Sequence, residues 1–231
     1  MIKLTNIQAT ARKRQLFQAE ELRVERGALL ALIGKNGAGK STFLKALAGL
    51  ESLVSGQISI EGSIYTFGKD YFPSKRVSYI PVKIVPFGAI SLLDFVLSGK
   101  SMERNFLDLP SQAEQQEVKD LLAQFNMEHM TNDAFENLSD GEQKLALIMR
   151  SVYRNADVLL LDEPESFLDV SNRKLVFEWL KKLSEQGITI IFSTHQPDLA
   201  AQFASGFLTI HEGKIRLESV DKLNAIVSEI F

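Results

Sequence analysis

Glycines and a lysine with the spacing of a phosphate-binding loop stand early in the chain. Residues 34–42 match the pattern G-x-x-x-x-G-K-[ST] at every defined position. An apolar run precedes the loop and a helical run follows it, which is the context that this pattern requires. The glycines let successive backbone N–H groups point at phosphate oxygens, and the start of the helix adds positive charge. The predicted phosphate-binding residues are Gly34, Lys35, Asn36, Gly37, Ala38, Gly39, Lys40, Ser41 and Thr42.

Two acidic residues follow an aliphatic run much later in the chain. Asp162 and Glu163 come directly after residues 158–161, which read Val-Leu-Leu-Leu. We expect Lys40 to bridge the terminal phosphates, and Ser41 and Asp162 to hold Mg²⁺. Transfer of a phosphoryl group to water also needs a group that orients and deprotonates the water. Glu163 is the candidate for that general base.

A histidine follows a third apolar run. The run covers residues 188–192, and His195 comes after a serine and a threonine. In doubly wound sheets, ligands lie outside the carboxyl ends of the strands. We therefore expect His195 to reach the terminal phosphate as a sensor or proton relay. A histidine without such a context is more often structural, so we interpret His129 and His211 as surface or packing residues.

These side chains need a sheet whose strands end side by side. Short β-rich runs alternate with helical patterns, which predicts an α/β fold with a mostly parallel sheet. Residues 118–125 and 175–183 carry apolar side chains at helical spacing, and we assign both stripes to core packing. Strands are expected at residues 2–7, 29–33, 57–60, 77–80, 158–161, 188–192 and 207–210.

The middle of the chain has a different pattern. Residues 84–150 show helical patterns and no run typical of a buried strand. We predict a helical subdomain there, inserted into a single domain that spans residues 1–231. Residues 221–231 carry apolar side chains at helical spacing and are expected to form an amphipathic tail helix. That helix either packs back on the domain or serves for docking.

Composition disfavours several classes of protein. The chain has 231 residues, with 26 Lys and Arg against 29 Asp and Glu and a net charge of −3. General binding of DNA or RNA is therefore disfavoured, because proteins that coat polyanions are usually basic. There is no cysteine, which excludes disulfides, thiolate metal sites and cysteine nucleophiles. No apolar stretch reaches the roughly 18–20 residues that cross a bilayer, so we expect a soluble, cytoplasmic protein.

One further motif identifies a family. Residues 138–143, Leu-Ser-Asp-Gly-Glu-Gln, resemble the signature LSGGQ or LSGGE of the ATP-binding cassette (ABC) ATPases. The motif opens a helix that we expect to run to about Tyr153. Residues 166–169, Ser-Phe-Leu-Asp, resemble the D-loop of the same family. Because the order and spacing of the motifs match over essentially all of residues 1–215, the chain is identified as a member of this family.

The resemblance implies a fold and a mechanism. The fold is a P-loop NTPase core with an N-terminal antiparallel β region and the inserted helical subdomain, and the ligands are ATP and Mg²⁺. Two copies would face each other as a homodimer, with each ATP between the phosphate loop of one copy and the signature of the other. Ser139, Gly141 and Glu142 would complete the nucleotide site of the second copy. Asp169 would couple the two sites, and hydrolysis by Glu163 would release the dimer.

Three positions depart from the family pattern. Asp140 stands where the middle glycine of the signature is usual, and Val82 stands where a glutamine usually contacts Mg²⁺ and the attacking water. Because some importer ATPases carry LSDGE, we do not interpret Asp140 as inactivating. Val82 cannot ligate a metal, so we expect it to affect catalytic rate and coupling. No aromatic residue occupies the usual adenine-stacking place; the candidate there is Arg12, the alternative being a solvated turn.

Other segments point to a class within the family. Residues 93–100 and 162–169 resemble the ATPases of importers for iron–siderophore, haem or cobalamin compounds. We therefore predict the ATPase subunit of such an importer, peripheral on the inner face of the cell membrane. Its partners would be integral membrane permease subunits, which residues 82–110 are expected to contact. The alternatives are an exporter ATPase subunit and a soluble ABC ATPase of the iron–sulfur assembly type.

Overall fold

The chain forms two compact units. The computed structural model describes residues 1–11, 14–51, 55–66, 76–83, 88–103 and 109–230, so the candidate Arg12 lies outside the described residues. The first unit, here the sheet unit, comprises Met1–Tyr79, Asp157–Pro164 and Phe177–Phe231. The second, the helical unit, comprises Ile80–Ala156 and Glu165–Val176. The prediction of one domain with a helical insertion at residues 84–150 stays a prediction.

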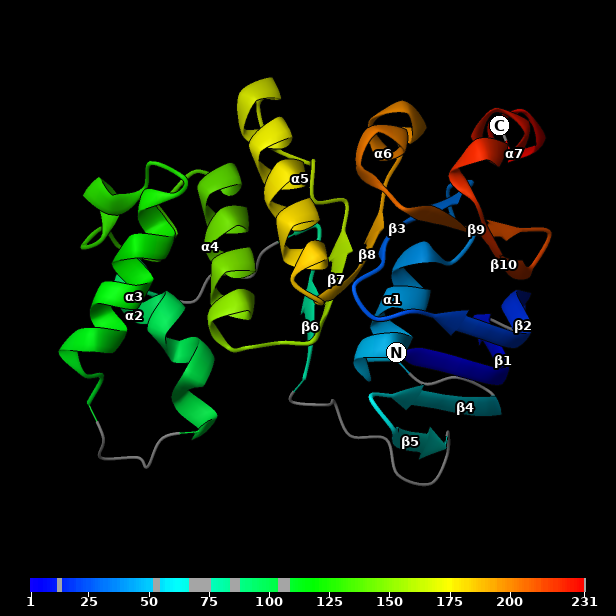
Figure 1. Ribbon diagram of the computed structural model, residues 1–231, viewed down its shortest axis with the longest axis horizontal. Coiled ribbons are helices and arrows are strands. Elements are labelled where there is room, and N and C mark those ends of the chain that lie inside the picture. Colours follow the sequence, from blue (N-terminus) through cyan, green and yellow to red (C-terminus); the bar gives the residue numbers. More distant parts are fainter. Residues whose placement is uncertain (12–13, 52–54, 67–75, 84–87, 104–108, 231) are drawn as a thin grey trace. The chain divides into compact units, whose positions relative to one another are not determined.

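A mixed sheet is the framework of the sheet unit. Within the described residues its strand order is β5-β4-β1-β2-β10-β9-β3-β8-β7-β6 (Figure 1). Strands β9, β3, β8 and β7 run parallel, whereas β1 pairs antiparallel with β2 and β4. The parallel core and the N-terminal antiparallel region are thus confirmed. The strands are β1 (Ile2–Ala11), β2 (Arg14–Val24), β3 (Leu29–Gly34), β4 (Ser55–Ile60), β5 (Ser63–Thr66), β6 (Val77–Ile80), β7 (Val158–Asp162), β8 (Thr189–Ser193), β9 (Gly206–His211) and β10 (Lys214–Glu218).

Each predicted strand is present, but three more strands were not predicted. The central strands β3, β7 and β8 are buried along their whole length, which explains their continuous apolar runs. The unpredicted strands β2, β5 and β10 expose one face or more, so their sequences lack such runs. In β2, for example, Phe17 and Ala19 are buried and Gln18 between them is exposed.

The sheet unit also contains helices α1 (Lys40–Ala48), α6 (Pro197–Phe203) and α7 (Leu223–Ile230) and the short 3₁₀ helix η4 (Val220–Lys222). In α1, Phe43 packs edge-on against Phe17 of β2, with ring centroids 5.5 Å apart. Helix α1 ends at Ala48. Gly49 takes the left-handed conformation there and Leu50 is exposed.

The helical unit is built on α2 (Leu92–Leu97), α3 (Gln112–Ala123) and α4 (Asp140–Tyr153), with 3₁₀ helices η1 (Ser98–Glu103), η2 (Glu128–Met130) and η3 (Phe135–Asn137). Helix α5 (Val170–Glu185) begins in this unit and ends in the sheet unit. The predicted end of the signature helix at Tyr153 is confirmed. The rings of Phe95 and Phe135 stack with centroids 4.1 Å apart, and the buried Lys144 donates from Nζ to Pro81 O at 2.7 Å.

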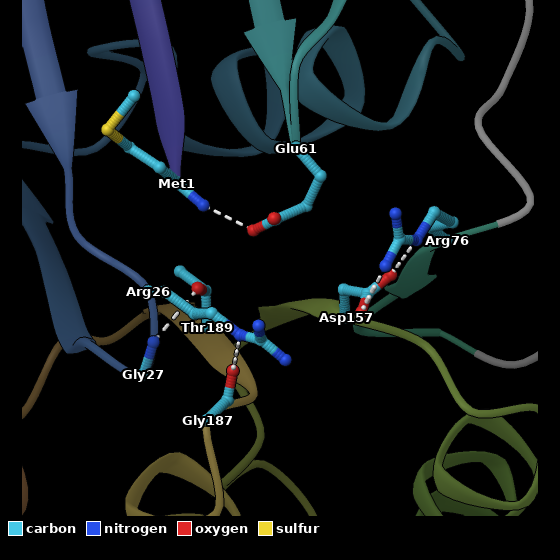
Figure 2. Close-up of polar contacts among 8 residues, drawn as sticks. All are labelled: Met1, Arg26, Gly27, Glu61, Arg76, Asp157, Gly187 and Thr189. Carbon is cyan, nitrogen blue, oxygen red and sulfur yellow. Dashed lines mark hydrogen bonds and ion pairs between the residues drawn. The ribbon is translucent and has the colours of Figure 1, made fainter.

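Polar contacts fix the amino-terminal ends of the central strands. The backbone N–H of Gly27, before β3, donates to Thr189 Oγ1 at 3.2 Å, and Arg26 Nε donates to Gly187 O at 3.3 Å (Figure 2). Figure 2 also shows the ion pairs Met1–Glu61 and Arg76–Asp157. These contacts hold the strands in register, so that their carboxyl ends meet at one edge. Among the described residues, no helix has both the length and the apolar character that crossing a membrane demands.

Candidate active site

The predicted phosphate loop connects β3 to α1. Strand β3 ends at Gly34, and α1 begins directly after Gly39, whose φ is 104°. A Cβ atom on Gly39 would lie 3.1 Å from Phe17 Cδ1 and 3.3 Å from Leu16 Cβ. Both the backbone conformation and the close packing therefore favour glycine at this position. The result is that the amino end of α1 faces the carboxyl edge of the parallel strands.

Lys40 is a charged side chain that is almost completely buried. Its Nζ donates to Gly34 O at 2.7 Å and lies 3.4 Å from Lys35 O, and the residue is 7% exposed. Burial lowers the pKa of Lys40, while the negative charges of Glu163 and Asp162 oppose that shift. The ammonium group thus lies between the loop carbonyls and two carboxylates, and it can also contact a bound anion.

Asp162 accepts hydrogen bonds from hydroxyl groups on both neighbouring strands. Ser193 Oγ of β8 donates to Oδ1 at 2.6 Å, and the Tyr79 hydroxyl of β6 donates to Oδ2 at 3.1 Å. The same Ser193 Oγ accepts the backbone N–H of Glu163 at 3.0 Å. Burial, and next the nearby charge of Asp162, raises the pKa of Tyr79, so its hydroxyl remains a donor. These contacts fix the carboxylate of Asp162 and the backbone of Glu163 together.

Glu163 and His195 form a pair at the same edge. Glu163 Oε1 lies 3.0 Å from His195 Nε2, and the two side chains are 29% and 39% exposed. Glu163 has a φ of 48°, an uncommon conformation for a residue of this type and one that recurs at functional sites. The carboxylate is within reach of both the histidine and the solvent, which is the geometry that a general base needs.

A cavity of about 360 Å³ brings half of the predicted site residues together. Besides Leu16, it is lined by Asn36, Gly37, Gly39, Lys40, Ser41, Thr42, Glu163 and His195. The loop, the start of α1 and the Glu163–His195 pair therefore surround one space. Lys35 and Ala38 line a second cavity, of about 550 Å³, beside it. The arrangement can hold an anion against backbone N–H groups and Lys40 while a carboxylate acts on water next to it.

Oxygen atoms suited to Mg²⁺ are present at this edge. Ser41 contributes a hydroxyl on the first turn of α1, and Asp162 contributes a carboxylate at the end of β7. Each Asp162 oxygen accepts one of the hydroxyl bonds described above, and a carboxylate offers about four lone-pair sites in all. Because Mg²⁺ in phosphate sites commonly takes one or two carboxylates, with phosphate and water as its other ligands, these residues fit it.

The predicted signature residues lie in the helical unit, where they have local structural contacts. Ser139 and Glu142 form a capping box at the start of α4: Ser139 Oγ accepts the Glu142 N–H at 3.3 Å, and the Ser139 N–H donates to Glu142 Oε2 at 2.8 Å. A Cβ on Gly141 would lie only 3.1 Å from Phe167 O, so the backbone approach leaves no room for a side chain. Their contacts with nucleotide stay predictions.

Asp169 and two of the departures from the family pattern, Val82 and Asp140, also lie in the helical unit. Asp169 Oδ1 accepts the Asn172 N–H at 2.7 Å, the contact of a helix cap at the start of α5. Val82, Lys83 and Asp140 border a cavity of about 290 Å³ together with Phe167. The position that usually carries glutamine therefore shares a cavity with the first residue of α4.

Two residues of the site, Ser193 and Tyr79, were missed by sequence reasoning. Tyr79 lies in β6, which was predicted with the correct bounds, and Ser193 is the last residue of β8, one position beyond the predicted strand. Neither residue was given a role. A signal was present for Ser193, because it is a hydroxyl at the end of a strand that is otherwise apolar around Ile190, Ile191 and Phe192. A buried hydroxyl at such a place needs a partner, and the carboxylate of the adjacent strand provides it.

Comparison with known proteins agrees with this geometry. The family model described as ABC transporter matches residues 17–166. The molybdate import ATP-binding protein MolC of Haemophilus influenzae is 34% identical over 198 residues, which are 85% of this chain and 73% of that protein. The manganese transport system ATP-binding protein MntB of Bacillus subtilis is 31% identical over 221 residues, 93% of this chain and 84% of that protein. A solved inward-facing ABC transporter assigned to the metal-chelate type is 28% identical, with a TM-score of 0.80 and coverage of 98% of this chain and 88% of that one.

Proposed function

The chain belongs to the ABC transporter family, whose ATP-binding proteins are ATPases that power transport, and we propose that it is the ATPase subunit of an importer. The observation that carries the proposal is the single cavity lined by Lys40, the amino end of α1 and the Glu163–His195 pair. Phosphate binding and water activation both need to occur within such a space. The names of the importer relatives support the direction of transport.

We propose the following roles within the sheet unit. The N–H groups of residues 34–42 and Lys40 Nζ bind the phosphates of ATP. Ser41 and Asp162 would hold Mg²⁺, which neutralises phosphate charge when bound. Glu163 orients the attacking water and accepts its proton on a carboxylate oxygen. His195, 3.0 Å from Glu163 Oε1, holds that carboxylate in place and faces the terminal phosphate.

We further propose that two copies form a homodimer through ATP. Ser139, Gly141 and Glu142 of one copy complete the nucleotide site of the other, and Asp169 couples the two sites. The capping box supports this proposal, because it fixes the start of α4 in a defined geometry, and the amino end of a helix favours an anion. In this proposal residues 1–231 act as one ATPase domain, with the helical subdomain at residues 84–150 and a tail at 221–231.

The proposed cargo is a metal compound of the iron–siderophore, haem or cobalamin class. The likeness to a transporter assigned to the metal-chelate type supports it, as does the manganese transport role of MntB. The chain would act on the inner face of the cell membrane, on integral permease subunits. Residues 82–110 are the proposed contact with the permease; of these, residues 84–87 and 104–108 lie outside the described part of the chain.

The test of the enzymatic proposal is ATP hydrolysis by the purified chain. Glu163→Gln removes the base but keeps the size of the side chain, so turnover should fall by at least about a hundredfold while ATP still binds. Glu185→Gln is the matched control, because Glu185 is an exposed carboxylate at the end of α5. Hydrolysis by Glu163→Gln at the rate of the unmodified chain would show that Glu163 is not the base.

Co-purification tests the transport proposal separately. The tagged chain is expressed at its native level, membranes are solubilised in mild detergent, and the co-eluting proteins are identified. We expect a stoichiometric protein with several membrane spans, whose own binding protein then identifies the cargo. Elution of the chain alone, from a fraction in which other transporters remain intact, would contradict the transport proposal and favour a soluble ABC ATPase.

A further inference from the structure

The strand order separates the surroundings of the phosphate loop into two sides. Strand β3, which leads into the phosphate loop, has β8 on one side and β9 on the other. Glu163 and His195 follow β7 and β8, so both lie on the β8 side. This inference rests on the proposed function, in which the terminal phosphate faces Glu163. Strands β9, β10 and β2 lie on the other side of β3, the side available to the rest of a nucleotide that extends away from Glu163.

The second cavity lies on that other side. It has a volume of about 550 Å³ and is lined by loop residues 35–38, by Gln15 and Leu16 of β2, and by residues 210–213. Leu16, Asn36 and Gly37 also line the phosphate cavity, so the two spaces share a wall. A ligand whose phosphates bind in the first cavity thus has the second cavity directly beside it. The size of the second cavity is that of a typical small-molecule pocket.

The β9–β10 hairpin forms a fixed wall of the second cavity. Gly213 O accepts the Gln18 N–H of β2 at 2.8 Å, which ties the tip of the hairpin to β2. Glu212 and Gly213 form the two-residue turn, and His211 pairs with Lys214 across it. His211 is thus the last residue of β9, held on a regular element with its side chain 25% exposed. A ligand in the cavity can reach this ring.

We propose that the nucleotide base binds in this second cavity and stacks on the imidazole ring of His211. Among the described residues that line the cavity, His211 is the one with an aromatic ring. Leu16 and Ile210 add aliphatic surface for the faces of a planar base, and the amide of Gln15 offers a donor and an acceptor for its edge. Histidine rings are among the surfaces on which proteins stack bases. The ring comes from a hairpin distant in sequence from the segment that holds Arg12.

Binding titrations of ATP and of tripolyphosphate, each with Mg²⁺, test the placement of the base. Tripolyphosphate lacks the base, so it reports on the phosphate cavity alone. His211→Ala should weaken ATP binding by about five- to a hundredfold, the usual effect of losing one stacking partner, and leave tripolyphosphate binding unchanged. His211→Phe keeps a ring and should bind ATP within about threefold of the unmodified chain. His129→Ala, an exposed histidine of the helical unit, should change neither ligand.

Two results would overturn the proposal. One is ATP binding by His211→Ala at the affinity of the unmodified chain. The other is an equal loss of ATP and tripolyphosphate binding, because that loss would belong to the phosphate cavity. Lys40→Ala separates this inference from the proposed function, since it should weaken both ligands. If Lys40→Ala leaves both affinities unchanged, the phosphate site itself is wrong; if it weakens both while His211→Ala changes nothing, only the placement of the base is wrong.

Discussion

At the scale of single residues, the positions of the two acidic groups depend on one buried hydroxyl. Ser193 Oγ donates to Asp162 Oδ1 and accepts the N–H of Glu163. A hydroxyl has one donor and two acceptor sites, so these two bonds use its donor and one of its acceptors. Removal of the oxygen leaves a buried carboxylate oxygen and a backbone N–H without this partner. We therefore regard Ser193 as a positioning residue for both Asp162 and Glu163.

Ser193→Ala should reduce turnover at unchanged ATP affinity and lower the free energy of unfolding by about 1–3 kcal/mol, the cost of leaving buried polar groups unsatisfied. Thr189→Ala is the matched control. Thr189 is a buried hydroxyl residue at the other end of β8, where it accepts the Gly27 N–H at 3.2 Å (Figure 2). Thr189→Ala should lower the free energy of unfolding without reducing turnover. An equal loss of turnover in the two variants, measured with denaturant unfolding and ATP hydrolysis, would assign Ser193 a merely structural role.

Tyr79 predicts a pH dependence of stability. Its pKa is raised above the ordinary value of 10.0 by burial and by the charge of Asp162. A group with a raised pKa in the folded state stabilises the fold fully below its unfolded pKa, and this contribution is lost as the pH rises above that value. The difference in the free energy of unfolding between the unmodified chain and Tyr79→Phe should therefore stay constant up to about pH 9 and shrink as the pH rises above about 10. Urea unfolding measures it, and a constant difference would contradict the assignment.

Motif spacing predicts some residues of the site and not others. Lys40, Glu163 and His195 were predicted because their chemistry is tied to a local pattern, and all three line the same cavity. Ser193 and Tyr79 act through hydrogen bonds between strands that are neighbours only in the sheet. Their role follows from the strand order, which the order along the chain does not reveal.

At the scale of elements, two helices begin in the same way and differ in their proposed roles. Ser139 with Glu142 caps α4, and Ser111 with Glu114 caps α3. Replacement of either serine by alanine should lower the free energy of unfolding by about 0.5–2 kcal/mol. Only Ser139→Ala should also lower turnover, because only Ser139 is proposed to contact the nucleotide of a second copy. Equal turnover in Ser139→Ala and Ser111→Ala, by ATP hydrolysis, would contradict the role of the signature.

Elements were predictable where their burial is uniform. The central strands β3, β7 and β8 read as apolar runs because both of their faces are covered. The missed strand β10 has a single buried residue, Ile215, between exposed neighbours, so its sequence resembles a loop.

At the scale of the whole molecule, the family follows from the order of the motifs, whereas the cargo does not. The phosphate loop, the signature and the acidic strand end occur in one order along the chain, and each is proposed to take part in binding ATP and Mg²⁺. A transported compound would contact the permease and its binding protein, so the ATP-binding motifs themselves carry no information about its chemistry. The proposed mechanism also needs two copies of the chain, because the signature residues of one copy are proposed to contact the nucleotide bound to the other.

The most direct test of the central claim is the molar mass of Glu163→Gln in solution with Mg²⁺ and ATP, measured by light scattering on a sizing column. Because this variant binds ATP without hydrolysing it, we predict a species of twice the 25.8 kDa of one chain. Addition of Ser139→Arg to the same variant should keep ATP binding and restore the mass of one chain, because the large cation blocks the signature of the partner copy. If Glu163→Gln saturated with ATP keeps the mass of one chain, ATP does not join two copies and the proposed mechanism is wrong.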